Sequence, residues 1–363
     1  MNEHTPVLEF RGVVKRYGAA TTPTLASLDL TLESGEFFSL IGPSGCGKTT
    51  TLKLVSGLER PTEGRVLLDG VDISALPPHR RPVHTVFQNY ALFPHMTVAQ
   101  NIAFGLAQTR IPRREIQTKV DEAVTMVGLD GNAAKKPSEL SGGMQQRVAL
   151  ARSLVLSPRI LLLDEPLGAL DLKLRQQMQV TLKRIQRETG VTFLYVTHDQ
   201  EEAFSMSDRI GFMHAGELVQ VDAPATMYHE PRNTRVADFV GKAVMLPVRE
   251  RRGGMLVTDH VEVLEREVPA APGADHGEVA IVVRPEKVVI ELPDAPQRAG
   301  ASLPGHVIDV SFKGGFSEVL VDVDGTEVAA HLNDARAAAR LHPGALVRAG
   351  FDPADAWLCP VSA

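Results

Sequence analysis

One glycine-rich segment has the residue types and spacing needed to hold phosphate groups. It comprises Gly42, Pro43, Ser44, Gly45, Cys46, Gly47, Lys48 and Thr49, with Thr50 directly after it. The spacing G-x-x-x-x-G-K-T follows the apolar run 37–41 and precedes an apolar-periodic stretch, the strand-loop-helix context that a phosphate-binding loop requires. Glycines let backbone N–H groups converge on phosphate oxygens, and the N-terminus of the following helix adds partial positive charge. The segment predicts a nucleoside triphosphate site in which the Lys48 ammonium reaches the β and γ phosphates and the Thr49 hydroxyl holds Mg²⁺.

A second segment carries two carboxylates directly after an apolar run. Residues 160–163 are Ile-Leu-Leu-Leu, and Asp164, Glu165 and Pro166 follow them. An apolar strand is typical of a sheet covered on both faces, and ligands bind at the carboxyl ends of such strands. Beside a phosphate loop, Asp164 is expected to join the Mg²⁺ shell and Glu165 to orient or deprotonate the attacking water. In isolation the two acids would also suit a helix N-cap.

A third segment, Leu140 to Arg147, reads LSGGMQQR. Ser141, Gly142 and Gly143 open a helical stretch there and so form another helix N-terminus that can bind an anion. The segment, with its interval to Asp164, resembles the signature motif of ABC-type ATPases. The resemblance implies that it faces the ATP of a partner subunit, so that two copies joined head to tail enclose two ATP molecules. Met144 stands where many members carry glutamine, which affects one neighbouring polar contact.

Other residues match the same family at the expected places. The resemblance implies that Tyr17 stacks on adenine, that Gln88 senses Mg²⁺ and the attacking water, and that His198 contacts the γ phosphate. It also implies that the loop 167–171 communicates between the two sites of the dimer. Taken alone, each has an ordinary structural interpretation: a half-buried tyrosine, a surface glutamine and a structural histidine.

Two further features have plain structural interpretations. Cys46 occupies a variable position of the phosphate loop and is expected to be a small filler. Asp199 and Glu202 have the spacing of a capping box for the helix after His198, and we do not expect them to bind a metal.

The elements that position these residues follow an α/β pattern over residues 1–240. One helix is expected from Pro112 to Val127, and another around Leu174 to Ile185 that stops at Gly190. A helical subdomain is expected over about 89–157. Strands are expected at Val7–Phe10, Leu28–Leu32, Phe37–Ile41, Arg65–Leu68, Ile160–Leu163 and Val191–Val196.

Residues 241–363 have a different character. Short β-rich pieces alternate with turn-rich stretches such as 292–305, and Asp324-Gly325 is a hairpin signal. This spacing predicts a small antiparallel barrel or sandwich. The region resembles the accessory β domain (OB- or TOBE-like) of importer ATPases, chiefly through Arg284-Pro285-Glu286. Without the resemblance, Pro285 would simply interrupt a strand at a sheet edge.

Composition excludes several classes of function. The formal net charge is −6 and the chain has one Trp and four Tyr, which argues against nucleic acid as a partner. Two cysteines suit a reducing compartment rather than a disulfide framework. The opening residues lack the pattern of a signal peptide, and no apolar run approaches the roughly 20 residues that span a bilayer. We therefore expect contact with a membrane through partners, at the cytoplasmic face of the cell (inner) membrane.

The resemblance also predicts a biological role. One nucleotide domain joined to an accessory β domain implies a binding-protein-dependent importer with two integral-membrane permease subunits and, indirectly, a solute-binding protein. The apolar segment 89–98 is expected to receive a permease helix. The run 174–220 and the ending FDPADAW look most like polyamine (spermidine/putrescine) uptake ATPases. Ferric iron, sulfate or another small solute remains the alternative, and a soluble regulatory ATPase with a ligand-binding β domain is the rival of a different class.

Overall fold

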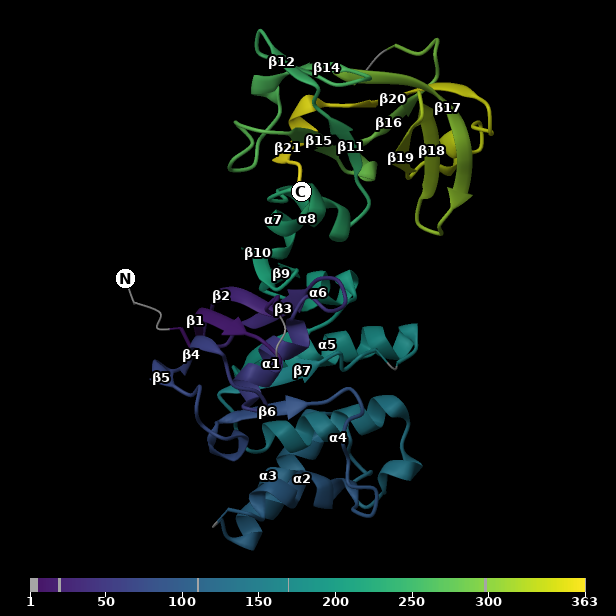
Figure 1. Cartoon of the computed structure of the whole chain (residues 1–363). Coiled ribbons are helices and arrows are strands. Elements are labelled where there is room, and N and C mark those ends of the chain that lie inside the picture. Colours follow the sequence, from purple (N-terminus) through teal and green to yellow (C-terminus); the bar gives the residue numbers. More distant parts are fainter. Residues whose placement is uncertain (1–5, 19–20, 110, 169, 297–298, 363) are drawn as a thin grey trace. The chain divides into compact units, whose positions relative to one another are not determined.

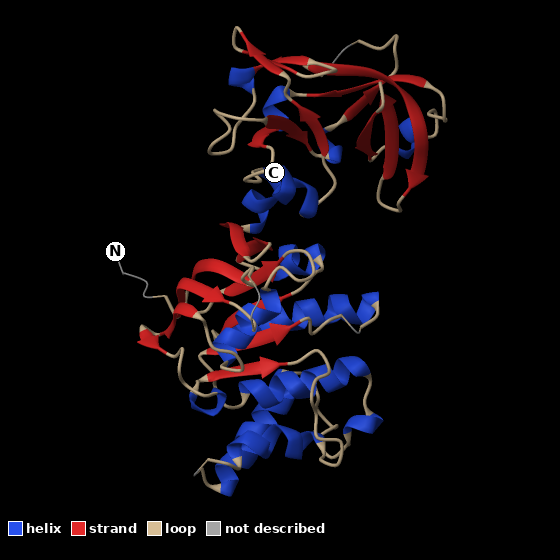
Figure 2. Ribbon diagram, viewed as in Figure 1, coloured by secondary structure: helices blue, strands red, loops and turns tan. Residues whose placement is uncertain are grey.

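The computed structural model describes residues 6–18, 21–109, 111–168, 170–296 and 299–362. The chain divides into two compact units, Met1–Pro224 and Ala225–Ala363 (Figure 1). The first unit is built on two sheets. The second is built on short antiparallel strands (Figure 2).

The central sheet of the first unit has the order β10-β9-β3-β8-β7-β6. Its inner strands β3, β8 and β7 pair in parallel and are apolar, as expected for strands covered on both faces. The strands are β3 (Phe37–Ile41), β6 (Val83–Val86), β7 (Ile160–Asp164), β8 (Thr192–Val196), β9 (Arg209–His214) and β10 (Glu217–Asp222). Because β3, β7 and β8 run in parallel, the segments that follow them meet at one edge of the sheet.

An antiparallel sheet of order β2-β1-β4-β5 shares a core with one face of this sheet and with α1 (Lys48–Ser56). Its strands are β1 (Leu8–Lys15), β2 (Leu25–Leu32), β4 (Glu63–Leu68) and β5 (Val71–Asp72). The expected strand Val7–Phe10 was too short, because β1 continues past a register shift between Phe10 and Val13. Such an irregularity breaks the strict alternation by which a strand is recognised in a sequence.

Helices cover the other face. The expected long helices are confirmed as α3 (Arg113–Met126) and α5 (Leu172–Thr189), and Gly190 ends α5 in the left-handed conformation with φ 65°. Between β6 and β7 in the chain, α3 packs with α2 (Val98–Leu106) and α4 (Gly142–Leu154), in the region where a helical subdomain was expected. The short helix α6 (Gln200–Met206) follows β8.

The second unit confirms the expected small β domain. A curled five-stranded sheet of order β16-β20-β17-β18-β19 is accompanied by two three-stranded sheets, β11-β15-β21 and β12-β13-β14 (Figures 1 and 2). Asp324 and Gly325 form the predicted hairpin turn, with φ of 47° and 86°. The strands are β11 (Val244–Pro247), β12 (Glu250–Arg252), β13 (Met255–Val257), β14 (Glu262–Leu264), β15 (Val279–Val283), β16 (Val289–Glu291), β17 (Ala301–Phe312), β18 (Ser317–Val323), β19 (Thr326–Leu332), β20 (Leu346–Phe351) and β21 (Trp357–Pro360).

Two expectations about this unit were wrong. The stretch 292–305 is not all turn, because β17 begins at Ala301 and pairs with β20 through residues 301–306. Burial of Ala301 and Leu303 outweighs the turn preference of the Pro and Gly that follow. Arg284-Pro285 does not interrupt an edge strand either. β15 ends at Val283, it is the central strand of its sheet, and Pro285 begins a 3₁₀ turn.

The division between the units falls at Pro224, earlier than the expected boundary near Gly241. Helices α7 (Pro224–His229) and α8 (Thr234–Phe239) precede the β domain, and Arg284 ties their segment to it. Its guanidinium donates to the carbonyls of Tyr228, Ala237, Gly241 and Lys242 at 2.7–3.2 Å. A sequence pattern cannot show this attachment, because Arg284 lies far along the chain from the residues it holds. Within the described ranges, none of the helices combines the length and apolar character needed to span a bilayer.

Candidate nucleotide site

The glycine-rich loop connects β3 to α1, at the carboxyl edge of the central sheet. Gly42 and Gly47 have φ of 148° and 110°, a region that side-chain-bearing residues rarely adopt. A Cβ at Gly42 would lie 2.1 Å from the Met213 carbonyl oxygen, and one at Gly47 would lie 2.6 Å from Leu25 Cδ2. A side chain at either position would strain the backbone and clash with neighbouring atoms. Both positions therefore require glycine.

The Lys48 side chain is buried beneath this loop. Its Nζ donates to the carbonyl oxygens of Gly42 at 2.7 Å and Pro43 at 3.0 Å, and it lies 3.7 Å from Cys46 Sγ. Cys46 is itself buried, as expected of a filler. The two loop carbonyls therefore hold the positive charge of the ammonium group against the loop.

Asp164 ends β7 beside the start of α1. Thr49 Oγ1 donates to Asp164 Oδ1 at 3.4 Å, so the structure brings together two residues from distant parts of the chain. Burial raises the pKa of the Asp164 carboxyl, and the neighbouring Glu165 carboxylate raises that pKa further. Two acids this close repel each other, and a cation between the Asp164 carboxylate and the Thr49 hydroxyl would relieve that repulsion.

Glu165 occupies a sharp turn directly after β7. Its φ is 45°, unusual for a residue with a side chain, and its N–H donates to the Val196 carbonyl at the end of β8. His198 follows the same strand, and its Nδ1 lies 3.4 Å from Glu165 Oε2. A pocket of about 260 Å³ collects these groups; it is lined by Thr24, Ser44, Gly45, Gly47, Lys48, Thr49, Thr50, Glu165 and His198.

Several predicted residues do not line this pocket, Asp164 and the segment 141–143 among them. Gln88 follows β6 and is exposed; its Nε2 would lie 3.9 Å from a Cβ at Gly168, beside the turn that carries Glu165. Tyr17 is half exposed, and the Lys15 ammonium lies 4.7 Å from the centre of its ring. Of the loop 167–171, residue Ala169 lies outside the described residues.

The signature segment forms the N-terminus of α4. Ser141 is its N-cap, with Oγ accepting from the Met144 N–H at 3.4 Å, and Ser141 and Gly142 are exposed while Gly143 is buried. Ser141 and Gly142 therefore place the start of α4 on the surface of the first unit. Met144 is partly buried against the helical core, so the side chain at this position makes an apolar contact.

The expected capping box after His198 is half wrong. Asp199 caps α6 by accepting from the Glu202 N–H at 3.2 Å, but the Glu202 carboxylate does not return to the cap. Instead it is buried and accepts from the Tyr195 hydroxyl at 2.5 Å and the Thr197 hydroxyl at 2.7 Å. The local spacing predicted the cap at Asp199. It could not show that hydroxyl groups of Tyr195 and Thr197 would donate to the Glu202 carboxylate.

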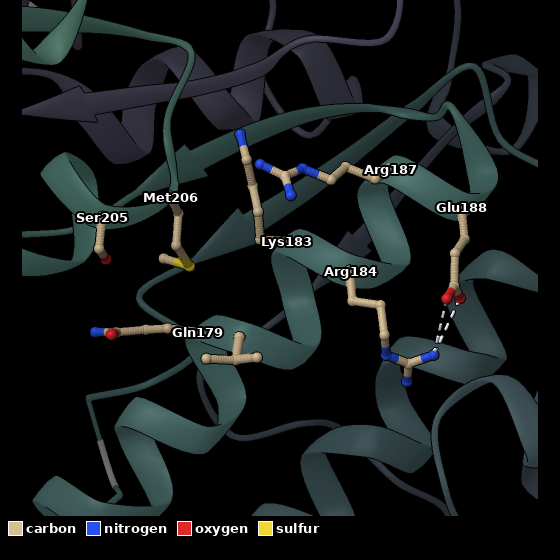
Figure 3. A pocket seen from close by; sticks show the side chains of 8 residues that line it. Gln179, Lys183, Arg184, Arg187, Glu188, Ser205 and Met206 are labelled. Carbon is tan, nitrogen blue, oxygen red and sulfur yellow. Dashed lines mark hydrogen bonds and ion pairs between the residues drawn. The ribbon is translucent and has the colours of Figure 1, made fainter.

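A larger hollow, about 530 Å³, lies along α5 and α6 (Figure 3). None of the predicted site residues lines it. Figure 3 shows the Arg184 guanidinium reaching the Glu188 carboxylate along the same helix, and Lys183 and Arg187 lie nearby. The Arg184 guanidinium is therefore paired within its own helix.

Comparison with known proteins agrees with this geometry. The ABC transporter family matches residues 25–168, and the TOBE domain family matches residues 281–358. The spermidine/putrescine import ATP-binding protein PotA of Rubrobacter xylanophilus is 48% identical over 357 residues, covering 96% of this chain and 93% of that protein. PotA of Acidothermus cellulolyticus is 49% identical over 327 residues, covering 88% and 84%.

Solved structures resemble the first unit. The ATP-binding cassette MJ0796, in a dimeric post-hydrolysis state bound to ADP and Pi, is 33% identical and covers 60% of this chain and 98% of its own, with a TM-score of 0.53. CbiO1 of Clostridium perfringens, part of the transporter complex cbiONQ, is 29% identical and covers 62% and 92%, with a TM-score of 0.59. This chain belongs to the ABC transporter family as an ATP-binding, ATP-hydrolysing transport subunit, with the spermidine/putrescine import ATP-binding proteins among its relatives.

Proposed function

We propose that this chain powers a binding-protein-dependent importer of spermidine and putrescine. Two copies would act on two integral-membrane permease subunits at the cytoplasmic face of the cell (inner) membrane. The observation that carries the substrate class is the similarity to PotA of Rubrobacter xylanophilus, because it extends over nearly the whole of both chains. It therefore includes the β domain as well as the nucleotide domain.

The pocket residues support the following division of work in hydrolysis. Lys48 and the loop N–H groups bind the β and γ phosphates and neutralise the charge that develops there. Glu165 orients the attacking water and accepts its proton, and His198, whose imidazole lies beside the Glu165 carboxylate, donates to a γ-phosphate oxygen. The 3.4 Å contact between the Glu165 and His198 side chains supports the pairing of these roles, because two groups so close would act on the same phosphate.

Mg²⁺ fits the donor set beside the loop. Thr49 and Asp164 would hold it, with Gln88 as a further oxygen donor, and the Thr49 hydroxyl and the Asp164 carboxylate already lie 3.4 Å apart. When bound, the ion would polarise the β and γ phosphates and neutralise part of their charge.

The partner copy would supply the other half of each site. Ser141 and Gly142 present a helix N-terminus on the surface, outside the pocket formed by the same chain. An exposed N-terminus of a helix of this length attracts phosphate, and the head-to-tail pairing of two copies would bring it to the partner's ATP. The dimeric structures of MJ0796, similar to this unit, support the pairing of two copies.

A permease helix would dock beside Gln88. Phe87 and Phe104 are exposed apolar side chains there, and Phe93 stacks on Phe104 with ring centres 4.5 Å apart. Arg152, on α4, donates to the carbonyls of Tyr90 and Ala91 and so shapes this surface from the signature helix. An apolar, aromatic surface of this kind suits the burial of a short amphipathic helix.

The test is reconstitution of the chain with its two permease subunits in lipid vesicles. We expect ATP hydrolysis to rise about tenfold or more when the solute-binding protein carries spermidine, in line with the coupling energies of linked sites. Binding proteins loaded with ferric iron or sulfate are the matched controls. Stimulation by one of those solutes would replace the polyamine assignment. Hydrolysis that is insensitive to any permease would favour a soluble regulatory ATPase.

A further inference from the structure

A network of polar side chains holds the backbone on both sides of His198. The residues on either side of this histidine, Thr197 and Asp199, are both held by side chains that the hydrolytic roles above do not use. Thr197 donates to the Glu202 carboxylate at 2.7 Å, and Asp199 Oδ2 accepts from Arg175 Nη1 at 2.9 Å. His198 itself has a side chain that is 64% exposed, so its position depends on the backbone that these neighbours fix.

Arg175 is the residue that closes the network. Its Nε lies 3.7 Å from Glu202 Oε1, and the Glu202 side chain is only 3% exposed, so that carboxylate needs a nearby cation. The other Glu202 oxygen, Oε2, accepts from both Tyr195 and Thr197, which leaves Oε1 facing the guanidinium. Arg175, on α5, thus holds the carboxylate that caps α6 and a carboxylate within that helix.

The same guanidinium reaches the loop that precedes α5. Arg175 Nη2 donates to the Leu170 carbonyl at 3.4 Å, and Asp171, the next residue, caps α5 through its side chain. A single planar group therefore joins the end of the 167–171 loop to the segment that carries His198. A guanidinium can make these contacts at once because its N–H groups diverge in one fixed plane.

We propose that Arg175 is a positioning residue for ATP hydrolysis, which sets the place of His198 by bracing residues 197–202 against the end of the 167–171 loop. Arg175 does not line the nucleotide pocket, so its effect is exerted through His198. The inference rests on the proposed role of His198 at the γ phosphate. If the 167–171 loop changes position when two copies meet, Arg175 would transmit that change to His198.

The test compares steady-state ATP hydrolysis by the purified full-length variants. Because R175M leaves the buried Glu202 unpaired, the double variant R175M/E202Q is made as well; the glutamine can keep an oxygen for Tyr195 and Thr197 without a buried charge. We expect both to lower kcat about tenfold or more with the KM for ATP within about threefold, the pattern of lost transition-state alignment. R175K should recover part of that loss, since a lysine can still pair with Asp199.

The matched control is R187M, on the same helix but with an exposed side chain, which should keep the wild-type kcat (Figure 3). A folded R175M/E202Q protein with the wild-type kcat, or one with a raised KM and unchanged kcat, would overturn the inference. H198A separates this from the proposed function. If H198A hydrolyses ATP normally, the role of His198 fails; if H198A is inactive while R175M/E202Q is active, the bracing role of Arg175 alone fails.

Discussion

The Nδ1 atom of His198 lies 3.4 Å from the Oε2 atom of Glu165, although the two residues follow different strands, β8 and β7. The strands are neighbours and parallel, with Asp164 opposite Val196, so the residues after them meet at one edge of the sheet. The Glu165 N–H is bonded to the Val196 carbonyl, which fixes the turn after β7 to the end of β8. The pairing of an acid and an imidazole at this pocket is therefore set by the sheet.

Replacement of Lys48 tests the phosphate loop. K48A removes the buried ammonium, and we expect ATP affinity to fall roughly a hundredfold, since a charge-assisted contact is lost in a confined site. Binding of a fluorescent ATP analogue by the full chain measures this. Lys53 is the control, because it lies on the same helix with an exposed side chain. Equal affinity of K48A and K53A would refute the role of the loop.

The two cysteines should differ in reactivity. Burial raises the pKa of Cys359 to about 12, so almost none of it is thiolate at neutral pH. Cys46 lies in the phosphate loop, 3.7 Å from Lys48 Nζ. Cys46 is buried as well, so a reagent can reach it only when the loop opens. We expect a small thiol reagent to label Cys46 slowly and block ATP turnover, with bound ATP slowing the reaction further. Peptide mapping identifies the site, and C46S should resist the reagent; inhibition that persists in C46S would contradict this prediction.

Asp164 should make the nucleotide-free protein less stable as pH rises. Burial and Glu165 raise its pKa in the folded state, so the folded protein binds this proton more tightly than the unfolded chain does. Below the pKa that Asp164 has in the unfolded chain, this carboxyl does not change the free energy of unfolding. Its destabilising effect grows as pH rises from there through the pKa that it has in the folded protein. We expect D164N to have a higher Tm than the wild type at neutral pH, a difference that shrinks toward acid pH. A lower Tm for D164N at neutral pH would count against this electrostatic account.

Arg284 should hold the segment 225–243 on the β domain. It is buried, and R284M would leave several carbonyls without a donor, so we expect a loss of about 2–4 kcal/mol in the free energy of unfolding. Thermal unfolding and limited proteolysis of the 225–243 segment measure the effect. K287M is the control, because Lys287 forms an exposed ion pair with Asp355. Equal stability of the two variants would show that Arg284 is dispensable.

Local signals in the sequence predicted much of the first unit. The strands β3, β7 and β8 and the helices α3 and α5 were recognised because each combines a strong apolar pattern with a clear start or stop, such as Gly190 after α5. Lys48, Asp164 and Glu165 were singled out for the same reason, because each stands next to such an element, whereas His198 was expected only from the family resemblance. Parallel pairing then had to bring them together.

The remaining features depend on contacts between distant residues. Arg175 and Glu202 belong to helices whose packing no local pattern describes, so their pairing was not foreseen. The same holds for Arg284, whose partners include residues 42 to 56 positions earlier in the chain. The irregularity in β1 hid part of that strand, since it breaks the period of two from which strands are read.

The most direct test of the account is the fate of ATP in E165Q. Glutamine keeps the shape of Glu165 but cannot accept a proton from the attacking water, so the variant should bind ATP without hydrolysing it. Light scattering after size-exclusion chromatography, with radiolabelled ATP and Mg²⁺, measures mass and bound nucleotide together. We predict a stable dimer carrying two intact ATP molecules for E165Q, and a monomer that releases ADP for the wild type. An E165Q protein that hydrolyses ATP at the wild-type rate, or that binds ATP as a monomer, would contradict the central claim.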